Sequence, residues 1–180
     1  MPFHYVQFFT ATILKWIPIL QNDSYKEIII DSLDYLTSKN KCEVYAFVIM
    51  PNHLHMIWRI NEHFERSDVQ RDFLKFTGQQ IKFRLQDMKS PLLQKFEVNL
   101  KDRKYQFWQR NALSIDLYSR EVIEQKLDYI HANPVSGKWN LVEDFTDYEY
   151  SSASFYEEGK TKFSFLKHYM EYLKSEKCCW

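Results

Sequence analysis

The chain has few glycines and prolines, no long apolar run and no excess of charge of either sign. Only 3 of its 180 residues are Gly and 5 are Pro, which excludes a collagen-like or linker-rich chain. No apolar run approaches the roughly 18 residues of a membrane span, and "MPFHYVQ" lacks the basic and then apolar layout of a secretion signal. These absences predict a globular cytoplasmic protein with no membrane partner.

Cysteine is scarce as well. Cys42, Cys178 and Cys179 are odd in number and include an adjacent pair, so they match neither a disulfide framework nor a zinc-type spacing. We expect reduced thiols. Apolar residues make up 45% of the sequence, and at this length they can bury one sizeable core, so we expect a single domain over residues 1–180.

Strand and helix patterns alternate along the chain. Aromatic and β-branched residues predict strands at "FHYVQFFTATI", "EVYAFVIM" and "HLHMIWRI", the last two joined by a Pro51-Asn52 turn, and "YQFWQR" is the candidate fourth strand. Helical spacing predicts helices from Ser24 to about Lys39, from Ser67 to about Leu85 and from Ser119 to Asn133.

Capping signals place the helix starts. Glu27 and Gln70 each stand three residues after a serine, at capping-box spacing. The resulting order, β-α-β-β-α-β-α, predicts an α+β fold: a ferredoxin-like antiparallel sheet with helices mainly on one face, plus one extra helix.

Two histidines occur in the apolar stretch "IMPNHLHMIW". Side chains two apart on a strand share a face, so His53 and His55 point away from the core that Leu54, Met56 and Trp58 enter. On an open sheet face the two imidazoles suit a divalent metal, but further ligands must come from elsewhere. The alternative is a pair of surface histidines with no role.

The helix from 119 to 133 carries a tyrosine beside its apolar stripe of Val122, Ile123, Leu127 and Ile130. Tyr129 and Asn133 share a helix face, Lys126 is close, and His131 points nearly the opposite way. A phenol beside a cation and a metal is a plausible nucleophile. The alternative is a tyrosine at the edge of the core with a solvated hydroxyl.

The combination of "MPNHLHMI", "FWQR" and "QKLDYIHANPV" resembles the REP-associated tyrosine transposases. These belong to the single-tyrosine branch of the HUH superfamily, together with the transposases of the simplest bacterial insertion sequences. The resemblance extends from "FFTATILKWIPIL" to "DYEYSSASFY", and the paired signature is highly specific.

The resemblance implies that His53 and His55 bind a metal and that Tyr129 is the nucleophile. Related insertion-sequence enzymes have a glutamine as third ligand where this chain has Asn133. The implied activity is cleavage of single-stranded DNA next to a hairpin, through a 5′-phosphotyrosine link that leaves a 3′ hydroxyl free for rejoining. The implied cofactor is Mg²⁺ or Mn²⁺, and the implied location is the bacterial cytoplasm, associated at most with the nucleoid.

Contacts with DNA must come from local clusters, since 24 basic residues balance 24 acidic ones. The expected phosphate contacts are Lys75, Lys82, Arg84, Arg110 and Lys126, and the expected base-stacking rings are Trp108, Tyr148 and Tyr150. Solvated faces and core packing are the alternative explanations.

Two other functions are weighed against an active strand transferase. One is a domesticated protein that binds hairpin DNA without cutting it, which the intact tyrosine and histidines disfavour. The other is a metal hydrolase that uses water as nucleophile, which the lack of an acidic residue in the motif disfavours. A monomer is favoured over a homodimer.

Overall fold

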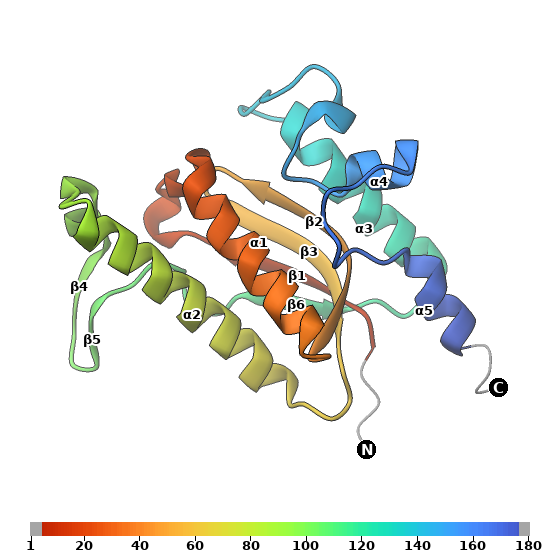
Figure 1. The fold of residues 1–180 in the computed structure, drawn as a ribbon, viewed down its shortest axis with the longest axis horizontal. Coiled ribbons are helices and arrows are strands. Elements are labelled where there is room, and N and C mark those ends of the chain that lie inside the picture. Colours follow the sequence, from red (N-terminus) through yellow and green to blue (C-terminus); the bar gives the residue numbers. More distant parts are fainter. Residues whose placement is uncertain (1–4, 177–180) are drawn as a thin grey trace.

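The computed structural model describes residues 5–176, in which four strands form one antiparallel sheet in the order β2-β3-β1-β6 (Figure 1). The strands are β1 (Gln7–Thr12), β2 (Cys42–Met50), β3 (His53–Ile60) and β6 (Leu113–Asp116). Helix α1 (Asp23–Ser38) connects β1 to β2, and α2 (Arg66–Asp87) follows β3. This topology confirms the expected ferredoxin-like α+β fold. Phe3, Cys178 and Cys179 lie outside the described residues.

The two faces of the sheet are both covered. Leu54, Met56 and Trp58 have no exposed surface and point toward the face covered by α1 and α2, where the Trp58 ring lies 5.9 Å from that of Phe73 of α2 (Figure 1). Helix α3 (Arg120–Ala132) packs on β2 and β3 from the other side, the side of the histidines. The expectation of an open histidine face was therefore wrong, because the extra helix covers it.

The tight turn between β2 and β3 is confirmed. β2 ends at Met50 and β3 begins at His53, so Pro51 and Asn52 alone connect them. Helix α3 also begins as expected, since the Ser119 side chain accepts a hydrogen bond from the Val122 amide. Val122 itself is 38% exposed, so it lies outside the buried stripe in which we placed it.

The starts of the other two helices differ from the expected capping boxes. Asn22, and not Ser24, caps α1 by accepting a hydrogen bond from the Ser24 amide. Glu65 precedes α2 without a side-chain cap. Gln70 instead donates to Gln7 of β1 and Ser114 of β6, because tertiary partners lie within its reach.

The fourth strand lies later in the chain than expected. Within "YQFWQR", only Tyr105 belongs to a strand, the last residue of a small hairpin formed by β4 (Glu97–Leu100) and β5 (Arg103–Tyr105). Trp108 makes a single bridge to Ile13. Strand β6 pairs with β1 instead, and its pattern is inverted: Leu113 and Ile115 are exposed while polar side chains face α2.

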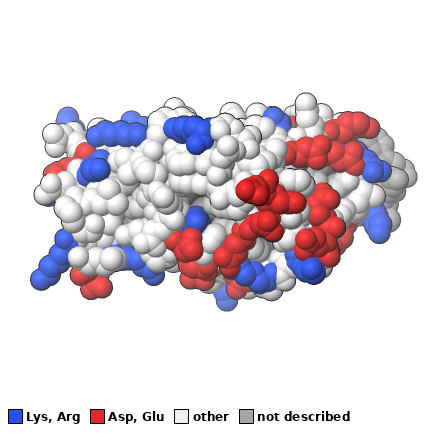
Figure 2. Space-filling view, turned by 90° about the horizontal axis from the view of Figure 1, so that it is seen from above, with Lys and Arg blue, Asp and Glu red and all other residues white. Residues whose placement is uncertain are grey.

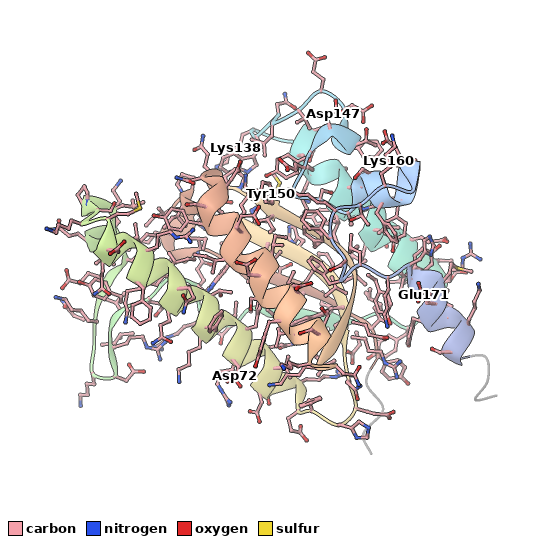
Figure 3. The ribbon with its side chains drawn as sticks, viewed as in Figure 1. Asp72, Lys138, Asp147, Tyr150, Lys160 and Glu171 are labelled. Carbon is pink, nitrogen blue, oxygen red and sulfur yellow. The ribbon has the colours of Figure 1, made fainter. Side chains whose placement is uncertain are left out.

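The segment after α3 packs on the remaining side of that helix. It contains the helices α4 (Ala153–Glu158) and α5 (Tyr169–Glu176). Short 3-10 turns occur along the described residues as η1 (Leu14–Trp16), η2 (Ile19–Gln21), η3 (Pro91–Phe96), η4 (Asn133–Val135) and η5 (Phe145–Asp147). Tyr150 lies near α1 (Figure 3), where its hydroxyl donates to Glu27 at 2.6 Å. None of the helices in residues 5–176 combines the length and apolar character of a membrane span.

Candidate active site

His53 is held between two asparagines. Its Nδ1 lies 2.7 Å from Oδ1 of Asn52, and its Nε2 lies 3.4 Å from Oδ1 of Asn133. Each amide nitrogen donates to a backbone carbonyl, that of Trp16 for Asn52 and that of Tyr129 for Asn133. Both amide oxygens are therefore directed at the imidazole.

His55 is the more deeply buried histidine, at 6% exposure. Its Nδ1 lies 2.7 Å from Oγ1 of Thr10, and the Phe8 ring stacks on it at 5.3 Å. The centroids of the two imidazoles are 4.7 Å apart. Both rings use Nδ1 in their shortest contact, so Nε2 is the nitrogen of each ring that is left for a metal.

Helix α3 brings Tyr129 to this pair. Its ring centroid lies 5.2 Å from that of His55, and the residue is 50% exposed. The Lys126 ammonium, one turn earlier, lies 5.8 Å from the Tyr129 ring and 4.9 Å from the Phe8 ring. A solvent-accessible phenol thus stands beside a cation and two imidazoles.

Burial favours the neutral form of both histidines. Burial lowers the pKa of His55 to about 3, with the neighbouring His53 and Lys126 adding to the effect. Burial also lowers the pKa of His53, although the oxygen of Asn133 favours its charged form. Neutral imidazole is the form that binds metal ions.

The contacts of His53 fit a cation at this position. A neutral imidazole can donate through one nitrogen only, and the short contact with Asn52 uses it. The lone pair of Nε2 then faces the lone pairs of Asn133 Oδ1 at 3.4 Å, close to the roughly 3.0–3.4 Å between two ligands each about 2.1 Å from one ion. Across residues 5–176, no three His, Cys, Asp or Glu side chains form a metal cluster, and the amide oxygen of Asn133 is a further donor beside Nε2 of His53.

His131 points away from this site. It is 5% exposed, its Nε2 lies 2.9 Å from Oγ of Ser152, and burial lowers its pKa to about 4. Asn133 retains helical φ and ψ despite the following Pro134, so the helix does not unwind before Ile130. The geometry therefore brings Asn133, and not His131, to the histidine pair.

A groove with a volume of about 660 Å³ runs between α2 and the segment from 102 to 112. Lys75, Lys82 and Arg110 line it. Its floor includes Trp108, which is only 7% exposed and donates through its indole nitrogen to Thr77. This burial contradicts a base-stacking role for Trp108, because the ring belongs to the core.

The expected base-stacking role of Tyr148 and Tyr150 was also wrong. Tyr148 and Tyr150 are 9% and 5% exposed, so neither ring offers a face to a base. Arg84 is exposed but lies outside the groove, and its guanidinium donates to the Ser24 carbonyl of α1. A DNA contact by Arg84 stays a prediction.

The neutral net charge conceals a strong segregation of charge. Residues 66–112 contain 11 Lys and Arg against 5 Asp and Glu, a net charge of +6, whereas residues 113–176 contain 7 against 12, a net charge of −5. Figure 2 shows basic side chains at the left end of the molecule and acidic ones grouped over its centre and right. Asp147 and Glu171 lie in the acidic part (Figure 3). The basic part includes α2 and the groove.

Sequence reasoning missed the residues that orient the histidines. Asn52 stands directly before His53, and an amide at a tight turn could have been recognised as its partner. Thr10 comes to His55 only through the β1–β3 register, which places these two residues opposite each other. No local signal in the sequence marks it.

A histidine pair on a ferredoxin-like sheet, facing a tyrosine on an opposing helix, is the arrangement that the resemblance to tyrosine transposases implies. The model of the family described as "Transposase IS200 like" matches residues 17–133. This chain belongs to the IS200-like transposase family.

One relative supports the family assignment, and one solved structure shares the fold. A Haemophilus influenzae protein, named provisionally as a REP-associated tyrosine transposase, is 30% identical over 158 residues, which cover 83% of this chain and 84% of that protein. A solved structure of a REP-associated tyrosine transposase bound to a REP hairpin is similar in fold, with a TM-score of 0.63 at 19% identity over 93% of this chain and 96% of that one.

Proposed function

We propose that this protein is a metal-dependent endonuclease and strand transferase that cuts single-stranded DNA near a hairpin through a covalent 5′-phosphotyrosine. The observation that carries the proposal is the position of Tyr129, half exposed, with its ring 5.2 Å from that of His55. A tyrosine serving the core alone has no need of a cation and two oriented imidazoles beside it.

In the proposed reaction, the Tyr129 oxygen attacks the scissile phosphorus. An O–P bond to tyrosine forms, the P–O3′ bond breaks, the phenol proton is released and the departing 3′ oxygen takes up a proton to become a hydroxyl. One phosphodiester replaces another, so no external energy is needed, and a 3′ hydroxyl can reverse the step on a new strand. The Lys126 ammonium, 5.8 Å from the Tyr129 ring, brings positive charge to the side of the scissile phosphate.

His53, His55 and Asn133 would hold the metal, which we propose to be Mg²⁺ or Mn²⁺. A divalent ion supplies charge stabilisation for the phosphate oxygens and the leaving oxygen. Three neutral ligands leave its double charge undiminished toward DNA, which carboxylates would partly cancel. The role of the protein is to fix both Nε2 atoms toward one point, through the Nδ1 contacts with Asn52 and Thr10.

The groove at the basic end is the proposed contact for the hairpin. Lys75 and Arg110 are exposed there and Lys82 lines the same groove, so a phosphate backbone can meet three cations. Because Thr10 pairs with Leu113, the segment with Arg110 reaches the strand next to the histidines. A hairpin in this groove would have its unpaired flank close to Tyr129.

The test is formation of a covalent adduct. The protein is incubated with Mg²⁺ or Mn²⁺ and a hairpin-bearing single strand, and the products are separated on a denaturing gel. Tyr129→Phe should abolish the adduct and leave hairpin binding within a few-fold, because only the nucleophilic oxygen is lost. Tyr118→Phe is the matched control, because Tyr118 is a tyrosine that is 73% exposed and lies just before α3. The Tyr118→Phe variant should form the adduct normally. An adduct in Tyr129→Phe would assign the nucleophile to another residue.

A further inference from the structure

Trp16 is a large aromatic residue that contributes little to the core. It is 57% exposed, and η1, the turn that contains it, has no buried residue. Its ring centroid lies 6.4 Å from that of His53, in an edge-to-face arrangement. The exposed ring therefore borders the side of the histidine pair that lies away from Thr10.

The backbone at this turn is strained to present the ring. Lys15 and Trp16 have φ of 54° and 59°, a left-handed conformation that residues with a Cβ rarely adopt. A glycine would adopt this conformation without strain, but neither residue is a glycine. Strained residues of this kind cluster at ligand sites, where the surrounding structure fixes them.

Asn52 links the turn to the histidine. This residue is 2% exposed, and its side chain donates to the Trp16 carbonyl at 3.3 Å while its oxygen accepts from Nδ1 of His53 at 2.7 Å. The Asn52 carbonyl also accepts from the Ile13 amide at 2.8 Å. One buried side chain thus sets both the exposed tryptophan and the imidazole in a fixed relation.

The residue that precedes Trp16 in the sequence is a cation. Lys15 is exposed, and within residues 5–176 no side chain forms a salt bridge with it. An exposed ring together with a lysine one residue away is the chemistry that holds a nucleotide, with the base on the ring and the phosphate on the cation. A duplex does not offer the face of an inner base, so this chemistry selects an unpaired nucleotide.

We propose that Lys15 and Trp16 hold one unpaired nucleotide of the DNA strand beside the cleavage point, with its base stacked on Trp16 and its phosphate near Lys15. This inference rests on the proposed function for its substrate and adds a nucleotide subsite to it. Stacking on Trp16 would fix the strand at the His53 side of the site, while Tyr129 and Lys126 act from the His55 side.

The test combines protein variants with abasic substrates. The cut is first mapped with the unaltered protein, and each nucleotide near it is then replaced in turn by an abasic residue. The rate of adduct formation at low DNA concentration should fall about tenfold for one position only, the typical value of one base–aromatic stack. Trp16→Ala should lose about the same factor with the intact strand and become insensitive to that position, whereas Trp16→Phe should retain most of the rate.

Matched controls separate stacking from a general effect of lost surface area. Tyr35 on α1 is also 57% exposed, and Tyr35→Ala should behave as the unaltered protein does. Lys15→Ala should make the negative slope of log affinity against log salt shallower by about 0.7, the value for one phosphate of a single strand. Lys15→Arg should restore the original slope. Equal abasic sensitivity in Trp16→Ala and the unaltered protein would overturn the subsite.

The same DNA strands distinguish this failure from that of the proposed function. If no adduct forms, cleavage is refuted, and equilibrium binding of the abasic series to Tyr129→Phe and to Tyr129→Phe with Trp16→Ala still decides the subsite. The subsite is supported if one abasic position weakens binding to Tyr129→Phe but not to the double variant. A change of oligomeric state in Trp16→Ala with unchanged DNA binding would assign the ring to a contact between copies and overturn the proposal.

Discussion

The hydroxyl of Thr10 lies 2.7 Å from Nδ1 of His55, directly across the β1–β3 pairing. This contact occupies Nδ1 of His55 and leaves Nε2 as the ring nitrogen that can bind a metal when the hydroxyl accepts from Nδ1. It joins the edge of the histidine site to a strand that contributes no proposed ligand.

Thr10→Val should weaken metal binding without disturbing the sheet, because it keeps the β-branched shape and removes only the hydroxyl. Loss of such a supporting contact typically lowers metal affinity about 10–100-fold. The measurement is adduct formation against Mn²⁺ concentration. Thr12→Val, two residues along the same strand face and opposite His53, is the control and should leave the curve in place. Identical curves for all three proteins would remove Thr10 from the site.

Asn133→Ala should shift the same Mn²⁺ curve to higher concentration, and His131→Ala should not. Asn133 Oδ1 lies 3.4 Å from Nε2 of His53, whereas His131 forms a hydrogen bond with the Ser152 hydroxyl on the far side of α3. His131→Ala should instead lower thermal stability, because the buried Ser152 hydroxyl loses a partner. The opposite ranking of the two variants on the metal curve would make His131 the ligand.

Cys42 provides a pH test remote from the site. Burial, followed by the charge of Glu43, raises the pKa of this thiol from 9.0 to about 12. The unfolded chain therefore loses the thiol proton first, so the stabilisation is complete below pH 9 and is lost as pH rises toward 12.

The free energy of unfolding should consequently fall between pH 8 and 9.5, and the part of the slope that comes from Cys42 should approach about 1 kcal/mol per pH unit at the upper end. Urea titrations across this range measure the slope. Cys42→Ala removes this contribution, so its slope should be shallower than that of the unaltered protein by up to about 1 kcal/mol per pH unit, while buried tyrosines such as Tyr148, whose pKa burial also raises, contribute equally to both proteins. Equal slopes in the two proteins would show that the Cys42 thiol contributes nothing.

The parts of the fold that sequence predicted are those with local signals. The β2–β3 hairpin was found from apolar runs flanking Pro51-Asn52, and α3 from its apolar stripe and the Ser119 cap. Strand β6 was missed because its apolar residues, such as Ile115, face outward, while Asp116 faces α2 and pairs with Arg66 at 2.9 Å. A partly buried polar contact of this kind inverts the pattern on which strand prediction relies.

The site was predictable to the same extent. Strand alternation put His53 and His55 on one face, and helix spacing put Tyr129 and Asn133 together. Alternation could not show that α3 folds back over the histidines, because that depends on a connection between distant segments. Nor could spacing reveal Trp16, whose importance lies in a contact with the β2–β3 turn.

The charge segregation leads to the last prediction. Each phosphate contact with duplex DNA releases counterions, so the loss of one contact should weaken hairpin binding and make the negative slope of log affinity against log salt shallower by about 0.9. We expect this result for each of the groove variants Lys75→Ala, Lys82→Ala and Arg110→Ala. Lys160→Ala, in the acidic part of the molecule (Figure 3), is the control and should leave the slope unchanged. Arg84→Ala should affect stability more than the slope if its bond to α1 is its main role. Slopes that are unaltered in all three groove variants would make those lysines and Arg110 ordinary solvated side chains and place the hairpin elsewhere.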